Sequence, residues 1–162
     1  MNGSTENQTS GASEQDGGRD IVLTWTTSHR MLPLVQRIID DIMSHRQALA
    51  RLLPEKSRLD KQRRGLAWPD RSRRYRLQEE ITDLERGLDE AHIELDVLGV
   101  AVFDADRGLV GFPTLVNNRR AFFSWRPGDD GLKSWHFAGE NLRRPVPISW
   151  MTNMDCRRPV KS

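Results

Sequence analysis

The amino-acid sequence predicts an α+β fold in which a long antiparallel helical hairpin, coiled-coil-like in its spacing, packs against a small antiparallel β-meander of three to four strands. Up to residue 98, apolar residues recur three and four positions apart over two long stretches, as they do on helices. After Gly99, short β-branched and aromatic runs alternate with turn residues. The 162 residues, 30% of them charged and 36% hydrophobic, suit one domain built on long solvated helices.

The composition of the two ends differs from that of the middle. Residues 1–20 contain no Ile, Leu, Val or aromatic residue, so we expect a disordered N-terminal tail. Residues 21–147 are expected to form the single domain, with the helical hairpin at 28–98 and the β-meander at 100–137. Residues 148–162 have no periodicity and are expected to form an irregular C-terminal tail.

The first helix is expected after a short strand, "IVLTW" at 21–25, and the N-cap oxygens of "TTS" at 26–28. Pro33 falls in the first helical turn, where its missing N–H costs little, and Pro54 is expected to kink or end the helix. The apolar stripe is wide, which indicates more than one packing neighbour. It comprises Met31, Leu32, Val35, Ile38, Ile39, Ile42, Leu49, Leu52 and Leu53.

The second helix has a cleaner seam that alternates steps of four and three. It comprises Leu77, Ile81, Leu84, Leu88, Ala91, Leu95 and Leu98, with Gly99 placed as a C-terminal cap. The turn between the helices is expected at "RRGLAWPD", residues 63–70. Folding the chain about residue 65 places His45 near Leu84, with Glu85 as its hydrogen-bond partner.

Five short runs are expected to supply the strands. The Asn-Asn pair at 117–118 tolerates the positive φ of a tight hairpin between two of them. The runs are "VAVF" (100–103), "LVGF" (109–112), "TLV" (114–116), "RAFFSW" (120–125) and "LKSWHF" (132–137).

The stretch "SWRPGDDGLKSWHF" at 124–137 predicts a two-faced hairpin that closes around residues 127–131. Cross-strand partners share a face, so pairing Phe123 with Trp135 puts Trp125 and Trp135 on the core face. Arg126 and His136 then lie on the opposite face. A slip of one residue in the register would reverse this assignment.

The charges are segregated along the chain, although the net charge is only +2. Residues 56–74 carry a net +6 and residues 77–98 a net −7. Together with Trp68 and Tyr75, the basic tip has the composition of a nucleic-acid-binding surface. The same composition also suits a hairpin tip whose charges only keep it soluble. Nucleic acid is therefore the less favoured partner. The candidate residues at this tip are Arg63, Arg64, Arg71, Arg73 and Arg74.

Several motifs are set aside. "DEAH" at 89–92 lies on a helix seam and no G-x-x-x-x-G-K-[ST] loop accompanies it. His92 and Asp96 have helical metal-pair spacing, but nothing nearby completes a ligand set, so no metal and no cofactor is expected. No run is long and apolar enough for a membrane span, and no secretory signal is visible. The single Cys156 fits a reducing cytoplasm.

Candidate ligand-binding residues gather in the β-region of the sequence. Arg suits carboxylate or phosphate recognition, and Asp and His could act as acid and base. Asp and Arg between two strands are also ordinary turn chemistry. The candidates are Asp104, Asp106, Arg107, Arg126 and His136.

The runs "RGLVGFP" (107–113), "SWR" (124–126), "GDD" (128–130) and "WH" (135–136), with "MLPLV" at 31–35, resemble the bacterial proteins grouped as domain of unknown function 2203. The resemblance covers roughly residues 23–145 and implies a fold and a bacterial cytoplasmic setting, without catalytic residues. This sequence departs from the family pattern, with Gly111 at a usual Asp, Ser124 at a common Cys, and Asp129 or Asp130 at a usual Glu. A metal or thiol chemistry that used the first two would be lost here.

Three functions remain open. The first is an interaction or scaffold module that acts through the hairpin on a protein partner or on a second copy. The second is a module that binds a small molecule or anion through Arg107, Arg126 and His136. The third is an enzyme that uses Asp104, Asp106 and His136. Because no nucleophile motif, metal spacing or phosphate loop is present, a non-enzymatic role is favoured and no catalytic residue is assigned.

Overall fold

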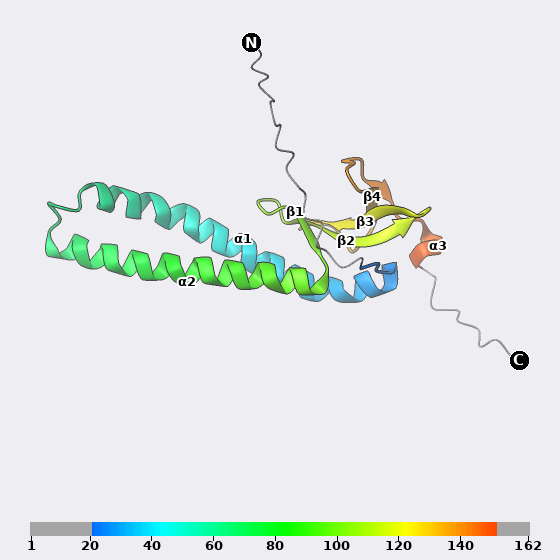
Figure 1. Ribbon diagram of the computed structural model, residues 1–162, viewed down its shortest axis with the longest axis horizontal. Helices are drawn as coiled ribbons and strands as arrows, with labels where there is room; N and C mark the ends of the chain where they lie inside the picture. Colours follow the sequence, from blue (N-terminus) through cyan, green and yellow to red (C-terminus); the bar gives the residue numbers. More distant parts are fainter. Residues whose placement is uncertain (1–20, 152–162) are drawn as a thin grey trace, which may run out of the picture.

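Two long helices form a hairpin, and a five-stranded sheet packs against one end of it (Figure 1). The computed structural model describes residues 21–151, so the tail expected at 1–20 and residues 152–162 lie outside the described residues. Along the chain the elements are α1 (Trp25–Lys61), α2 (Trp68–Leu98), β1 (Ala101–Asp104), β2 (Leu109–Val116), β3 (Arg119–Trp125), β4 (Ser134–Phe137), β5 (Arg144–Pro145) and α3 (Ile148–Met151). The predicted α+β class is confirmed, with one strand more than expected.

Helix α1 starts earlier and ends later than the sequence indicated. Thr24 is its N-cap, and the hydroxyl of Thr24 accepts a hydrogen bond from the Thr27 backbone N–H at 3.2 Å. The strand expected at 21–25 was therefore wrong, because capping starts the helix within that run. Pro54 does not end α1 either. Proline removes one helical hydrogen bond. Two ion pairs between α1 and α2, Arg73–Glu55 and Arg74–Asp60, offset this loss together with the burial of Leu59, which is 3% exposed.

The turn and the capping of α2 follow the prediction, whereas the register of the hairpin does not. Pro69 lies in the first turn of α2, and Gly99 caps its end with φ 75°. The imidazole of His45 lies on Gly87, about one helical turn from the expected Leu84, and its Nδ1 bonds the Asp41 carbonyl in place of Glu85. The facing position on α2 is therefore three residues further along the helix than predicted.

The sheet is antiparallel throughout, with strand order β1-β2-β3-β4-β5. The runs 109–112 and 114–116 form one strand, β2, which continues through Pro113 opposite Phe122. Asn117 (φ 52°) and Asn118 (φ 59°) make the predicted tight turn between β2 and β3. The two-residue β5 was not predicted, because it lies in a Pro-rich stretch without alternation.

The core lies between the first half of α1, the end of α2 and one face of the sheet. Phe112 and Ile39 are fully buried there, and the indole of Trp25 donates to the Leu132 carbonyl at 2.8 Å. Residues 148–151, which the sequence placed in the tail, form the helical turn α3. Its Trp150 packs on Trp135, with ring centroids 5.3 Å apart.

The distal part of the hairpin, residues 51–83, extends beyond the sheet, and we call it the arm (Figure 1). In the arm, the large apolar side chains that are buried belong to Leu59, Leu77 and Ile81. They form a narrow seam between the two helices. The arm is therefore held together by this seam and by the charged contacts on its flanks.

Candidate functional site

The β3–β4 hairpin has the two faces that the sequence predicted. Phe123 pairs with Trp135 and Ser124 with Ser134. Trp125 (3% exposed) and Trp135 (8%) lie in the core, so the two tryptophans do not form the rim of a site. His136 and Ser124 lie on the other side of the sheet, which we call the outer face.

Arg143 organises the polar part of the outer face. Its Nε donates to the Ser124 hydroxyl at 3.1 Å, and its guanidinium also donates to the Ser124 carbonyl at 3.2 Å and to Asp129 at 2.7 Å. Burial raises the pKa of Asp129, but hydrogen bonds from Arg143 and from the Arg126 backbone N–H outweigh burial and hold that pKa below its usual range. No pattern in the sequence indicated Arg143, because this residue lies in a segment without periodicity.

His136 lies beside this network in an aromatic setting. Its ring stacks on Phe122 at 5.7 Å between centroids and meets Phe103 edge-on at 5.2 Å. The side chain is 8% exposed, and its Nδ1 has no hydrogen-bond partner among residues 21–151. Burial, followed by the nearby Arg143, lowers the pKa of His136, so the neutral ring is favoured.

The other candidates of the β-region do not converge on His136. The Asp104 carboxylate accepts the backbone N–H groups of Asp106 (3.0 Å) and Arg107 (3.2 Å), as a turn residue does. The side chain of Arg107 is 84% exposed. Arg126 is exposed at the end of β3, four residues from the partner of His136, which is roughly 13 Å along a strand. The structure therefore separates the guanidinium groups of Arg107 and Arg126 from the imidazole.

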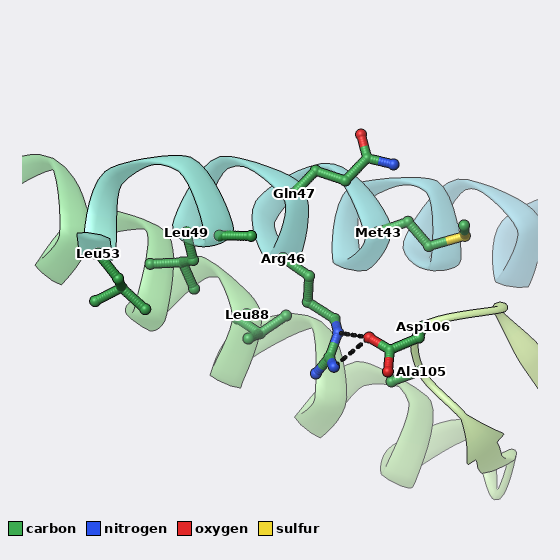
Figure 2. A pocket seen from close by; sticks show the side chains of 9 residues that line it. Met43, Arg46, Gln47, Leu49, Leu53, Leu88, Ala105 and Asp106 are labelled. Atoms are coloured by element: carbon green, nitrogen blue, oxygen red, sulfur yellow. Dashed lines mark hydrogen bonds and ion pairs between the residues drawn. The ribbon is translucent and has the colours of Figure 1, made fainter. Parts of the chain in front are cut away.

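A groove lies at the root of the arm, between α1, α2 and the β1–β2 turn (Figure 2). Its volume is about 380 Å³. At one side of the groove, Arg46 donates to Asp106 at 3.1 Å and ties the hairpin to the turn. The rest of the lining is mostly apolar, and it comes from Met43, Gln47, Leu49, Ala50, Leu53, Leu88 and Ala105.

The five basic candidates at the tip divide into two groups. Arg73 bonds Glu55 at 2.9 Å and Arg74 bonds Asp60 at 2.6 Å, so both hold the two helices together. Arg63, Arg64 and Arg71 remain exposed, and Arg71 lies 6.0 Å from the ring of Trp68. The basic surface that a partner could reach is smaller than the sequence indicated.

A model of the family described as an uncharacterized conserved protein (DUF2203) matches residues 21–146. The chain belongs to the DUF2203 family. No curated protein and no solved structure matched it.

Two positions that depart from the DUF2203 pattern are cross-strand neighbours on the outer face. Gly111 on β2 pairs with Ser124 on β3. A Cβ at position 111 would clash with a ring carbon of Phe103, so the absent side chain lets that ring lie against the strand. Ser124 is bonded to Arg143. In this DUF2203 chain, an aromatic ring and a guanidinium thus cover the two positions.

Within residues 21–151, no three His, Cys, Asp or Glu side chains are grouped so that they could hold a metal ion. In the same range, no helix combines the length and the hydropathy that a membrane crossing requires.

Proposed function

We propose that this protein is a non-enzymatic interaction module that binds another protein chain through its helical hairpin, with a second copy of itself as the first partner. The observation that carries the proposal is the arm. It projects beyond the sheet and exposes large apolar side chains that neither the sheet nor the partner helix covers: Leu53 is 45% exposed, Tyr75 66% and Trp68 71%. Exposed apolar clusters of this kind are typical of protein–protein contacts.

The segregated charges of the hairpin support the same proposal. The basic stretch at 56–74 and the acidic stretch at 77–98 occupy different lengths of one hairpin. Opposite charges on two copies can therefore meet without a second kind of partner, and such complementarity sets register and association rate. A cytoplasmic setting is proposed with it, since the sequence holds one cysteine.

Sedimentation equilibrium from about 1 to 200 μM tests the proposal, a range that covers weak and moderate self-association. We expect the full chain to dimerise with rising concentration. A variant with residues 56–76 replaced by a short Gly-Ser turn, which keeps the sheet and the root of the hairpin, should remain monomeric. A monomeric full chain at every concentration, or a shortened variant that dimerises as well as the full chain, would contradict the proposal.

The outer face supports a second candidate function, the binding of a small anion. Two observations favour it: the buried Nδ1 of His136 has no hydrogen-bond partner within residues 21–151, and the guanidinium of Arg143 lies nearby. We expect inorganic phosphate or acetate to raise the melting temperature of the full chain and to have no such effect on His136→Phe. Equal shifts in both proteins would show that the anion acts elsewhere.

A further inference from the structure

The surface of α2 that faces away from α1 carries one line of exposed apolar residues. Tyr75 and Ile93 are 18 residues apart, which is five full turns at about 3.6 residues per turn, so they lie on the same line. Trp68 and Val97 lie within roughly 40° of it. The buried seam residue Leu77 is on the opposite side. We call this line the outer stripe; its exposed apolar members are Trp68 (71%), Tyr75 (66%), Ile93 (60%) and Val97 (78%).

The flanks of the outer stripe are charged in opposite senses at its two ends. Arg71 and Arg76 lie beside its first half, and Glu90 and Asp96 lie beside its second half. None of these four side chains has an ion-pair partner among the described residues. Aromatic anchors thus lie at the basic end of the stripe, and aliphatic anchors lie at the acidic end.

We propose that the outer stripe binds the outer stripe of a second copy in antiparallel orientation, with the two-fold axis near Asp83. The inference rests on the proposed function and names the surface that the hairpin uses. In this orientation, residues whose numbers add to about 166 face each other. Trp68 meets Val97, and Arg76 meets Glu90. A two-fold axis makes each of these contacts occur twice.

The remaining positions agree with the same register. Arg71 faces Asp96 on one flank, and Glu79 in the middle of the stripe faces Arg86, which in the single chain bonds Asp83 at 2.7 Å. A parallel pair would instead place the basic ends together and the acidic ends together, which repels.

The extent of the contact indicates a dimer of moderate strength. Trp68 and Val97 are roughly 44 Å apart along the helix, from a rise of about 1.5 Å per residue. The apolar anchors lie at the two ends and the middle is polar, so the contact resembles transient interfaces more than obligate ones. We expect a dissociation constant on the order of 1–100 μM.

Cysteine cross-linking tests the orientation. In a Cys156→Ser background, which removes the native thiol, Thr82→Cys lies beside the axis and Ser72→Cys lies away from it. Antiparallel pairing brings the two copies of position 82 together and leaves the two copies of position 72 roughly 33 Å apart. We expect a disulfide-linked dimer from Thr82→Cys alone. Linkage at both positions would indicate a parallel pair, and linkage at neither would overturn the proposal.

Surface variants test the contact itself by sedimentation equilibrium. Ile93→Glu with Val97→Glu should raise the dimer dissociation constant at least tenfold, because both side chains are exposed in the single chain and their loss leaves the fold intact. The matched control Leu142→Glu, an exposed apolar position off the stripe at 63%, should leave it unchanged. If the stripe variants dimerise normally while the variant shortened at 56–76 does not, this proposal fails and the proposed function stands. A monomeric wild-type chain would refute both.

A charge exchange provides the final check on the register. Arg71→Asp and Asp96→Arg should each raise the dissociation constant several-fold, because each variant sets like charges against each other in the dimer. The double variant restores opposite charges and should return the constant to within about twofold of the wild-type value. A double variant as weak as the singles would exclude this register.

Discussion

Gly87 lies in the middle of α2, and the imidazole of His45 occupies the space where a side chain at position 87 would begin. A Cβ there would lie 2.8 Å from Nε2 of His45 and 3.2 Å from its Cδ2. Replacing a mid-helix glycine with alanine ordinarily stabilises by about 0.8–1.0 kcal/mol. In this protein the imidazole must move to make room for the new methyl group. The movement weakens or breaks its hydrogen bond to the Asp41 carbonyl, which contributes a net of about 0.5–1.5 kcal/mol to stability.

The two effects are of similar size, so Gly87→Ala should change the free energy of unfolding by less than about 0.5 kcal/mol. In a His45→Ala background the obstacle is gone, and the same substitution should stabilise by about 1 kcal/mol. The coupling between the two sites is therefore about 1 kcal/mol. Denaturant unfolding of the four proteins, followed by circular dichroism, measures it. Equal stabilisation by Gly87→Ala in both backgrounds would refute the register of the hairpin, on which the assignment of the outer stripe depends.

Three further predictions concern the sheet. Because the folded chain holds the pKa of His136 below that of the unfolded chain, the unfolded state binds a proton first. Stability should fall as the pH drops below about 6.5 and should level off at the folded pKa, whereas His136→Phe should flatten this slope in unfolding curves at pH 5 to 7. Arg143→Ala should cost about 1–3 kcal/mol and should raise the pKa values of both His136 and Asp129 in NMR titrations, while unchanged values would refute the network. Phe112→Ala should cost about 3–5 kcal/mol in denaturant unfolding, and a cost under 1 kcal/mol would contradict its burial.

The parts of the fold that the sequence predicted are those in which a local rule and the tertiary structure agree. The α2 seam, the Gly99 cap and the Asn117–Asn118 turn each follow from spacing or from a required positive φ. The errors fall where a longer-range contact decides. Pro54 breaks isolated helices, but α1 continues through it to Lys61, and ion pairs join this part of α1 to α2. The start of α1 was missed because Val22, Leu23 and Trp25 have strand propensity, whereas the Thr24 cap requires a helix.

The candidate site divides in the same way. Period-two alternation was enough to place Trp125 in the core and His136 on the outer face, since register fixes both. It could not supply Arg143, which reaches Ser124 from a segment that has no period of its own. Alternation also could not show that the Asp104 carboxylate accepts a backbone N–H of its own turn. An aspartate that stabilises a turn and an aspartate that binds a ligand look the same in a sequence.

The charges of the hairpin have two different uses, and the contacts within the single chain distinguish them. Hydrogen bonds from Arg73 lower the pKa of Glu55, and hydrogen bonds from Arg74 and Lys56 lower that of Asp60, so these side chains already have partners across the turn or along α1. They hold the helices together and are not available to another molecule. Among the described residues, charges without a printed ion pair include Arg71 and Arg76 near the tip of α2 and Glu90 and Asp96 near its root, on the outward surface of the helix. A surface that carries both signs at opposite ends, with apolar anchors at each, is self-complementary under a two-fold rotation, and this property favours a second copy over an unrelated partner.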